Sequence, residues 1–450
     1  MPTIEFIGQT RRNSGFWGAD TAQLINLFRE PAGDSFMLRS VLGTVDFADV
    51  GRVFTRDMIE NEGILYAVIG GGLYSITEAG SYSLLGAVED GEAVISTNNG
   101  KITVAAGGVY YVWDGSSLIA PVDGETYGAF VDVGSVTFIG QFTVMSERGG
   151  RQFQWSDAAD PAVVDGLSFA TAEGDDDDII RCEAVNGNLW LLKQGSIEVW
   201  YLSGDDAVFR RIAGGVIETG LKDHGLICRP PNAVFFIGSD GIAYVGSGTQ
   251  IAPISIPAVE RDISDGQARR CLYFEQDGHK FCVIQFSERM AWVYDLSTQE
   301  WHQRGHGVLH GPWEVVSSAK AWGRWFVGSD FGRIYELAPV NADADAPLLR
   351  TAISATLRDD NRRIVDAIGL FARAGWEGSI DTEPQIELRI SRDIGHTWTP
   401  PKPKGLGLVG QYDRRVIWRG LGQARQWVAR IDMSQPYDTP FMSKMDVVTR

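Results

Sequence analysis

Short apolar strands separated by glycine-rich turns recur along the middle of the chain. The pattern is clearest at 100–113, where apolar residues alternate along 102–106 and again, as Val, Tyr and Trp, along 109–113. Gly107 and Gly108 join the two segments. Alternation with a period of two on both sides of a Gly-Gly turn predicts a β-hairpin.

Seven such hairpins follow one another, each beginning at a Gly or an Asn. They begin at Gly63, Gly100, Gly140, Gly187, Asn232, Gly278 and Gly323. Successive starts lie 37, 40, 47, 45, 46 and 45 residues apart. Propeller blades repeat at roughly 40 to 50 residues with four strands each, and a lone hairpin buries too little apolar surface to be stable. We therefore predict an all-β protein with a β-propeller of six or seven blades at 61–345.

The repeat ends near residue 345, where 341–347 has the composition of a linker. Longer strands are predicted beyond it, at 365–373, 385–391, 415–419, 427–432 and 442–448. These predict a smaller C-terminal antiparallel β domain at 346–450, and we expect 1–60 to form an N-terminal arm or partial sheet. Apolar spacing at 19–28 predicts a short helix. A second helix is predicted at 257–263, because Pro is favoured in the first helical position.

Composition narrows the class of protein. With 44% hydrophobic and 22% charged residues, the chain resembles ordinary folded proteins. Its 53 glycines fit a chain rich in turns. The net charge of −18 argues against tight, sequence-independent binding of a phosphate backbone.

No apolar run reaches the roughly 20 residues that span a bilayer, and the N-terminus lacks the basic start and apolar core of a signal peptide. We therefore expect no membrane insertion. The four cysteines, which include no Cys-x-x-Cys pair, are Cys182, Cys228, Cys271 and Cys282. We predict that they are small buried side chains in a protein made in a reducing cytoplasm.

One segment outside the repeat fits the Asp-box pattern S-x-D-x-G-x-T-W. Its defining residues are Ser391, Asp393, Gly395, Thr397 and Trp398. In such a turn the carboxylate accepts bonds from backbone amides, the Gly adopts a positive φ and the Trp ring covers the corner. Sialidases carry several Asp boxes, as scaffold rather than as active site. A single copy outside the repeat therefore predicts a structural turn, with a sialidase site as the weaker alternative.

Two further patterns have both a chemical and a structural interpretation. His302, His306 and His310 would align for zinc on a helix, but the intervening glycines favour loop histidines. The four aspartates at 175–178 could hold Ca²⁺, yet they lack the alternating spacing of an EF-hand and favour a solvated loop.

The segment 293–301 resembles a kelch-type turn, in which Asp295 and Thr298 would shape the turn and Trp301 would pack between blades. No nucleophile elbow, Walker loop or dinucleotide fingerprint lies between a strand and a helix. We therefore predict no enzymatic activity, no catalytic residues, no metal ligands and no cofactor.

Taken in order along 24–425, a series of segments resembles the packaged-DNA stabilisation proteins of short-tailed phages, also described as tail hub or nozzle proteins. The segments lie at 24–27, Glu30, 42–44, 154–161, 169–174, 198–204, 209–212, 215–220, 278–281, 292–304, 332–335, 391–398, 415–419 and 421–422. Two departures stand out. Val45-Asp46 replaces the Pro-Gly turn that tends to follow 42–44 in the family, and Ser255-Ile256-Pro257 replaces its Ser-Thr-His.

The resemblance implies a structural protein of the virion tail, made in the cytoplasm of a bacterial host. It implies a homohexameric ring below the portal or head–tail adaptor that retains packaged DNA and carries tail fibres, tailspikes or a needle. Double-stranded DNA would pass without sequence-specific binding. Net acidity fits such a conduit, because negative walls would repel phosphate. The alternatives are a virion propeller that binds, or one that hydrolyses, a glycan of the host surface.

Overall fold

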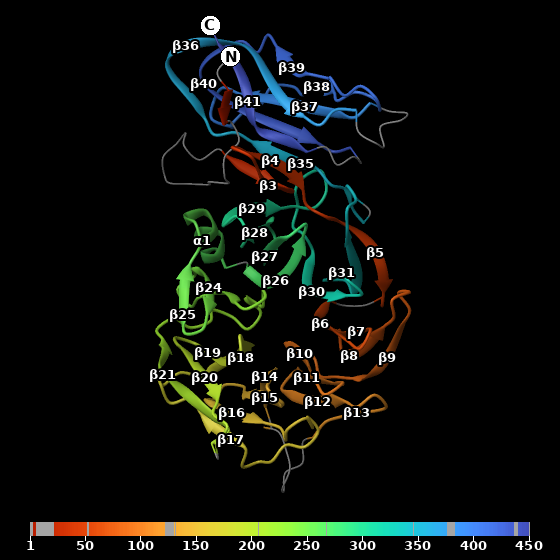
Figure 1. Cartoon of the computed structure of the whole chain (residues 1–450), viewed down its shortest axis with the longest axis vertical. Coiled ribbons are helices and arrows are strands. Elements are labelled where there is room, and N and C mark those ends of the chain that lie inside the picture. Colours follow the sequence, from red (N-terminus) through yellow and green to blue (C-terminus); the bar gives the residue numbers. More distant parts are fainter. Residues whose placement is uncertain are drawn as a thin grey trace.

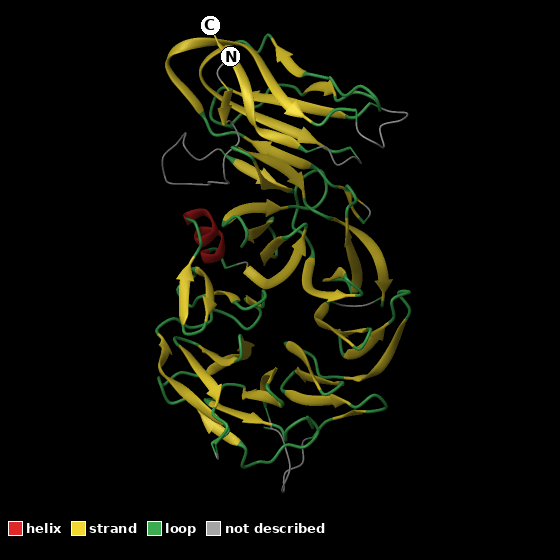
Figure 2. Cartoon of the chain, in the orientation of Figure 1, coloured by secondary structure: helices red, strands yellow, loops and turns green. Residues whose placement is uncertain are grey.

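The computed structural model describes residues 3–5, 22–51, 54–121, 130, 132–205, 207–266, 268–344, 346–375, 383–435 and 440–449. Within these ranges the chain forms the strands β1 to β41 and a single helix, α1. Figure 2 shows how strands dominate both parts of the molecule. A ring of sheets occupies the larger part, and a stack of longer strands lies beside the ring (Figure 1).

The ring consists of seven four-stranded antiparallel units, so the predicted β-propeller is confirmed. The sixth unit continues into the sandwich and the seventh also pairs with β33 (Ala342–Asp343); each unit is called a sheet below. We number the sheets in chain order. The first sheet contains β6 (Thr55–Asn61), β7 (Ile64–Ile69), β8 (Gly72–Ile76) and β9 (Tyr82–Ala87), and the second contains β10 (Ala93–Asn98), β11 (Lys101–Ala106), β12 (Val109–Trp113) and β13 (Leu118–Ile119). The third sheet contains β14 (Val133–Ile139), β15 (Phe142–Glu147), β16 (Gln152–Trp155) and β17 (Phe169–Thr171). The fourth sheet contains β18 (Ile179–Val185), β19 (Asn188–Lys193), β20 (Ile197–Leu202) and β21 (Phe209–Ile217). The fifth sheet contains β22 (Ile227–Cys228), β23 (Val234–Ile237), β24 (Ala243–Ser247) and β25 (Gln250–Pro253). The sixth sheet contains β26 (Ala268–Gln276), β27 (His279–Phe286), β28 (Ala291–Asp295) and β29 (Glu300–Arg304). The seventh sheet contains β30 (Val315–Ala321), β31 (Arg324–Ser329), β32 (Arg333–Ala338) and β5 (Gly43–Asp49).

Each of the seven predicted hairpins is the second and third strand of one sheet. The turn before the second strand usually has two residues of positive φ, as at Asn99 (51°) and Gly100 (77°) or Asn186 (49°) and Gly187 (79°). Such a pair matches the right-handed twist of the strands that it joins. This turn chemistry explains why a Gly or an Asn marks the start of every repeat.

The seventh sheet takes its outer strand from the other end of the propeller. β5 pairs antiparallel with β32, with Leu337 opposite Thr44. A Cβ on Gly43 would lie 2.2 Å from the carbonyl oxygen of Ala342, so only glycine allows this approach. The segment 1–60, which the sequence indicated as an arm or partial sheet, therefore has one strand in the seventh sheet and another, β6, in the first.

The strands beside the ring form a sandwich of two sheets. One has the order β3 (Leu27–Ala32), β4 (Ser35–Ser40), β41 (Phe441–Thr449), β36 (Leu357–Ala372) and β39 (Val416–Arg419), with β1 (Thr3–Glu5) also on β41. The other has the order β2 (Gln23–Ile25), β35 (Arg350–Ile353), β40 (Gln423–Met433), β37 (Gln385–Ser391) and β38 (Lys402–Gly405). Their inner faces share one apolar core that includes Leu38, Ile368, Leu388 and Trp418.

The helix predicted at 257–263 is confirmed as α1 (Pro257–Ser264). The helix predicted at 19–28 is wrong over its described part, since Gln23–Ile25 and Leu27–Ala32 are strands; residues 19–21 lie outside the described residues. The apolar side chains of Leu24 and Leu27 are buried in the sandwich core. Tertiary pairing with β29 and β35 outweighs the local helical spacing.

The propeller and the sandwich share a continuous sheet. β2 pairs in parallel with β29, the outer strand of the sixth sheet, and antiparallel with β35. Asn26, at the end of β2, is fully buried and has a positive φ of 57°. Its amide donates to the carbonyls of Gly305 (2.9 Å) and Leu349 (2.8 Å), and its oxygen accepts from Arg304 (3.2 Å) and from the Gly305 amide (3.0 Å). Backbone pairing and the Asn26 side chain therefore both join the two parts.

Candidate functional site

The centre of the propeller is lined by the first strands of its sheets. β30 contacts β6, β6 contacts β10, and β10 contacts β14 in the same way around the ring. Each of these strands lies at the edge of its sheet, so some of its backbone N–H groups have no hydrogen-bond acceptor within that sheet. Buried amides need such partners.

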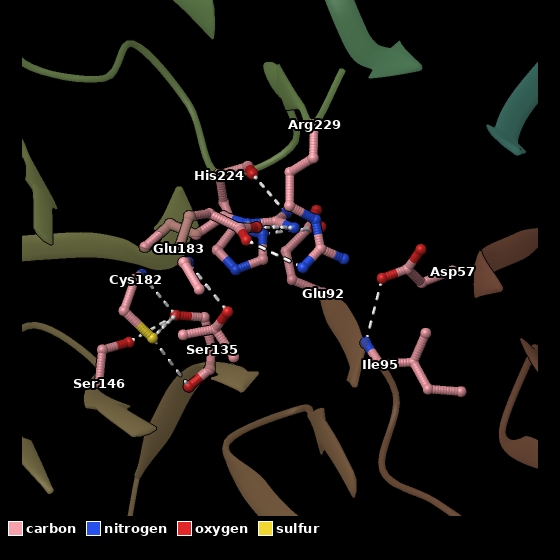
Figure 3. Close-up of polar contacts among 12 residues, drawn as sticks. Asp57, Glu92, Ile95, Ser135, Ser146, Cys182, Glu183, His224 and Arg229 are labelled. Atoms are coloured by element: carbon pink, nitrogen blue, oxygen red, sulfur yellow. Dashed lines mark hydrogen bonds and ion pairs between the residues drawn. The ribbon is translucent and has the colours of Figure 1, made fainter. Parts of the chain in front are cut away.

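Polar side chains of neighbouring sheets supply these partners. The carboxylate of Asp57 accepts a hydrogen bond from the Ile95 amide at 3.0 Å, and Ser135 Oγ accepts one from the Cys182 amide at 2.9 Å. Figure 3 shows both contacts. Thr137 Oγ1 accepts from the Ala184 amide between the same two sheets as Ser135 and Cys182, and Ser318 Oγ accepts from the Tyr273 amide between the sixth and seventh sheets. The paired residues are 38 to 47 positions apart, which is about one blade repeat.

A group of charged side chains crosses the ring. Glu92 precedes β10 of the second sheet, and its Oε2 lies 2.7 Å from Arg270 Nη2 on β26 of the sixth sheet. The same oxygen lies 3.5 Å from His224 Nδ1, which precedes the fifth sheet. The second sheet is three positions from both the fifth and the sixth in a ring of seven. These contacts therefore span the centre.

The protonation of this group follows from its surroundings. Burial raises the pKa of Glu92, but His224 and Arg270 outweigh it and hold that pKa at about 2. Burial lowers the pKa of His224, although its Nε2 lies 3.1 Å from the Gly134 carbonyl oxygen and Glu92 favours the charged ring. For Asp57, burial raises the pKa against the opposing effect of Arg181.

A second ion pair lies beside the first. Arg181 donates from Nε to Glu183 Oε1 at 2.7 Å, and its Nη1 donates to the His224 carbonyl oxygen at 3.2 Å. The other oxygen of Glu183 lies 3.2 Å from Arg229 Nη1. In Figure 3 the Arg229 side chain extends toward the space between Glu183 and Asp57.

Together these side chains cross the propeller's own channel. A cavity of about 300 Å³ lies beside them. A DNA duplex, whose major groove alone is about 12 Å wide, does not fit where Glu92 and Arg270 meet at 2.7 Å. Any passage for DNA must therefore lie outside the individual propeller.

The Asp-box residues lie in the sandwich, between β37 and β38. Asp393 accepts hydrogen bonds from Ser391 Oγ at 2.7 Å and from the amide and hydroxyl of Thr397 at 2.8 and 2.5 Å. Gly395 has a φ of 88°, and its amide donates to Ser391 Oγ at 2.7 Å. These bonds, those from Thr397 first, hold the pKa of Asp393 well below its usual range. Trp398, the last residue of the pattern, is half-buried in the same turn.

The three histidines point to different partners. His302 is buried on β29 against Phe281, and burial lowers its pKa to about 4. His310 Nε2 lies 2.9 Å from Thr351 Oγ1, whereas His306 Nδ1 lies 3.8 Å from an oxygen of Asp343. No group of three or more His, Cys, Asp or Glu side chains suited to a metal ion occurs among the described residues.

Part of the acidic loop 175–178 surrounds a buried lysine. Lys193 Nζ lies 2.7 Å from Asp177 Oδ1 and 2.7 Å from the Asp175 carbonyl oxygen, and its third contact is Glu198 at 3.3 Å. Asp177 also accepts from the amides of Gly195 and Ser196. Asp177 is thus the counter-ion of a buried ammonium group, whereas Asp175 and Asp176 are exposed.

The kelch-type turn is confirmed. Asp295 accepts from the Ser297 amide and from Thr298 Oγ1, each at 2.9 Å. Trp301 is buried in the core between the fifth and sixth sheets, and its Nε1 donates to the Ile254 carbonyl oxygen at 2.8 Å. All four cysteines are buried and free, as predicted.

Sequence reasoning missed the charged group at the centre of the ring. Its members come from five separate repeats and lie in no common local sequence pattern. The repeat period is the signal that could have located the inner strands. Asp57 and Ile95 lie on equivalent inner strands one repeat apart, and so do Ser135 and Cys182.

Two family models match this chain. The model described as "Bacteriophage P22 Gp10, beta-propeller" matches residues 7–341, and the one described as "Bacteriophage P22 Gp10, beta-sandwich" matches residues 350–437. The two matches follow the order of the two structural parts. In the part of the chain that the structure describes, no helix has the length and hydropathy needed to cross a membrane.

Similar solved structures include the computationally designed Ika8 protein, with 15% identity over 74% of this chain and 100% of that one, and a TM-score of 0.39. PorZ, a type-IX secretion component of Porphyromonas gingivalis, has 12% identity over 74% and 45% of the two chains and a TM-score of 0.41. The extracellular domain of the putative hybrid two-component system BT4673 of B. thetaiotaomicron has 8% identity over 75% and 44%, with a TM-score of 0.46. No curated protein matches the chain significantly.

Proposed function

The chain belongs to the family of bacteriophage P22 Gp10, the tail hub or stabilisation proteins of short-tailed phages, and we propose that six copies form a ring below the portal or head–tail adaptor. The ring would extend the DNA channel and retain the packaged genome. It would also carry fibres, tailspikes or a needle. The observation that carries this proposal is the match of both family models, in order, to the propeller and the sandwich.

Two structural features support a ring of several copies. The propeller's own channel is crossed by the Glu92–Arg270 ion pair, so a DNA conduit requires space enclosed by several chains. The sheet shared by β29, β2 and β35 holds the sandwich to the propeller by backbone hydrogen bonds, which suits a part that bears load.

We propose that the protein works by assembly and channel closure rather than by catalysis. In this proposal the Asp box at Ser391–Trp398 is a structural turn, because the Asp393 carboxylate is occupied by Ser391 and Thr397. Six copies with a charge of −18 each would surround DNA with a net acidic protein, which favours sliding over binding.

The test is to stop translation of this gene in its phage and to assay the particles for DNA and for tails. We expect heads that fill and then lose their DNA, with no tail assembled. The gene supplied in trans should restore stable particles. Full, stable, tailed particles that fail only to attach would refute the hub and favour a peripheral glycan-binding protein.

A further inference from the structure

A lysine, an aspartate and a glutamate meet at one end of the fourth sheet. Lys193, the last residue of β19, is fully buried, and its Nζ lies 2.7 Å from Asp177 Oδ1 and 3.3 Å from Glu198 Oε1. The side chain of Glu198 is also fully buried, and that of Asp177 is 15% exposed. An amine nitrogen is therefore held against one carboxyl group, with a second carboxylate beside it.

The two carboxylate oxygens of Asp177 have different surroundings. Oδ2 accepts hydrogen bonds from the backbone amides of Gly195 at 2.7 Å and Ser196 at 3.0 Å. Two such amides stabilise negative charge on the oxygen of a tetrahedral carbon, as an oxyanion hole does. Oδ1 instead faces Lys193 and accepts from Ser196 Oγ at 3.0 Å. The Asp177 Cγ atom is therefore polarised on one side and has the amine on the other.

Before any reaction these groups form an ion pair. Burial raises the pKa of Asp177, but the hydrogen bonds from Lys193 and from the Gly195 amide outweigh it and hold that pKa below its usual range. A buried ion pair is costly to desolvate, and transfer of a proton from Nζ to a carboxylate replaces two charges by a neutral amine and an acid. Glu198 lies within reach of Nζ and can take this proton.

We propose that Lys193 and Asp177 form an intramolecular isopeptide bond. Nζ attacks Cγ of Asp177, the charge of the intermediate rests on Oδ2, and Oδ1 leaves as water. One ammonium proton stays on the amide nitrogen and two leave with the water, so the atoms balance and no oxidant or cofactor is consumed. Glu198 carries one of the two protons from Nζ to Oδ1.

Fixed geometry is what favours this bond over the separate groups. Reactants held in position within one molecule reach effective concentrations of roughly 10⁵ to 10⁸ M. The bond would tie the acidic loop 175–178 covalently to β19 of the fourth sheet. Each chain would react once, which is self-modification rather than turnover, and the inference does not depend on the proposed ring.

The mass of the intact full chain, purified and then denatured, tests this inference. We expect a mass that is lower than that of the sequence by one water, and a protease digest in which the peptides containing Asp177 and Lys193 are joined. Lys101 is the matched control, since its Nζ lies 2.8 Å from Asp160 Oδ1 and both side chains are partly exposed. No second carboxylate contacts Lys101 among the described residues, so its peptide should be unlinked in the same digest.

Three variants separate the roles of the three side chains. Lys193→Arg keeps the positive charge but has no neutral amine, and should have the full mass. Asp177→Asn should still link, with loss of ammonia in place of water, because an amide carbon accepts the same attack. Glu198→Gln should leave most newly made chains unlinked, because proton transfer contributes roughly 10² to 10⁴ to such rates.

The measurement on the unmodified chain does not depend on whether the variants fold. A full mass for that chain would overturn the inference. So would a deficit of one water that persists in Lys193→Arg, since the water would then be lost elsewhere, or linkage in Glu198→Gln that is as fast as in the unmodified chain.

Discussion

Asn26 is a buried side chain at the junction between propeller and sandwich. Four hydrogen bonds of 2.8 to 3.2 Å use all the capacity of its amide, and the residue is fully buried. Three of the bonds join neutral groups, worth about 1 kcal/mol each, and the one from Arg304 adds about 1.5 to 2 kcal/mol. Removal of the side chain should therefore cost about 4 to 5 kcal/mol of unfolding free energy.

Two substitutions separate the hydrogen bonds from the backbone conformation. Asn26→Ala adds strain of about 1 kcal/mol at the positive φ. Asn26→Gly avoids that strain but loses about 0.5 to 1 kcal/mol because the unfolded chain gains freedom. The two variants should consequently lose similar amounts of stability. Asn186→Ala, at an exposed turn residue with a φ of 49°, is the control and should lose only the strain of about 1 kcal/mol.

Guanidinium chloride unfolding, followed by the fluorescence of the 14 tryptophans, measures these differences. Because β29, β2 and β35 form one sheet, we expect the unmodified chain to unfold in a single transition and the Asn26 variants to show a separate, earlier transition of the sandwich. A loss no larger than that of Asn186→Ala would refute the role assigned to Asn26.

Three further changes test individual features. Gly43→Ala would place a Cβ 2.2 Å from the Ala342 carbonyl oxygen and should therefore detach β5 from β32. Hydrogen exchange would show this as a loss of amide protection at residues 43–49. Lys193→Met would leave the Glu198 carboxylate buried without its ammonium partner and should cost about 3 to 5 kcal/mol in denaturant unfolding; a loss below 1 kcal/mol would contradict this. Burial lowers the pKa of His302 from 6.5 to about 4, so protonation of this side chain favours the unfolded chain. The free energy of unfolding should therefore decrease as the pH is lowered from 6.5 to 4. His302→Phe should remove about 3 kcal/mol of this dependence, measured as unfolding free energy against pH; an unchanged pH profile would count against it.

The parts of the fold that repeat could be predicted from the sequence. Each hairpin carries its own signal, since alternation and turn residues such as Asn99-Gly100 lie within a few positions of one another. The strand predicted at 385–391 is also correct to the residue. Local chemistry determines these elements, so no knowledge of distant partners is needed.

The junction and the central cavity could not be predicted in this way. Local spacing predicts a helix at 23–25, because the partners that make these residues a strand, β29 and β35, lie some 300 residues away. Likewise the contact of Glu92 with Arg270 depends on closure of the ring, which places the second sheet opposite the sixth. Sequence patterns indicate local structure, because they depend on residues that are close together in the chain. The junction and the Glu92–Arg270 contact instead join residues that only the folded topology brings together.

The pairing of the early strands also limits the order in which the structure can form. β5 needs β32 and β2 needs β29 and β35, while β4 pairs with β41, with Met37 opposite Met442. Pairings between such distant residues form slowly, because long loops must close before any contact is gained. The first six sheets consist of strands that are consecutive in the chain and can form as they are made. The seventh sheet and the sandwich combine strands from both ends of the chain, so neither can be completed until its later strands, β32 and β41 respectively, have been made.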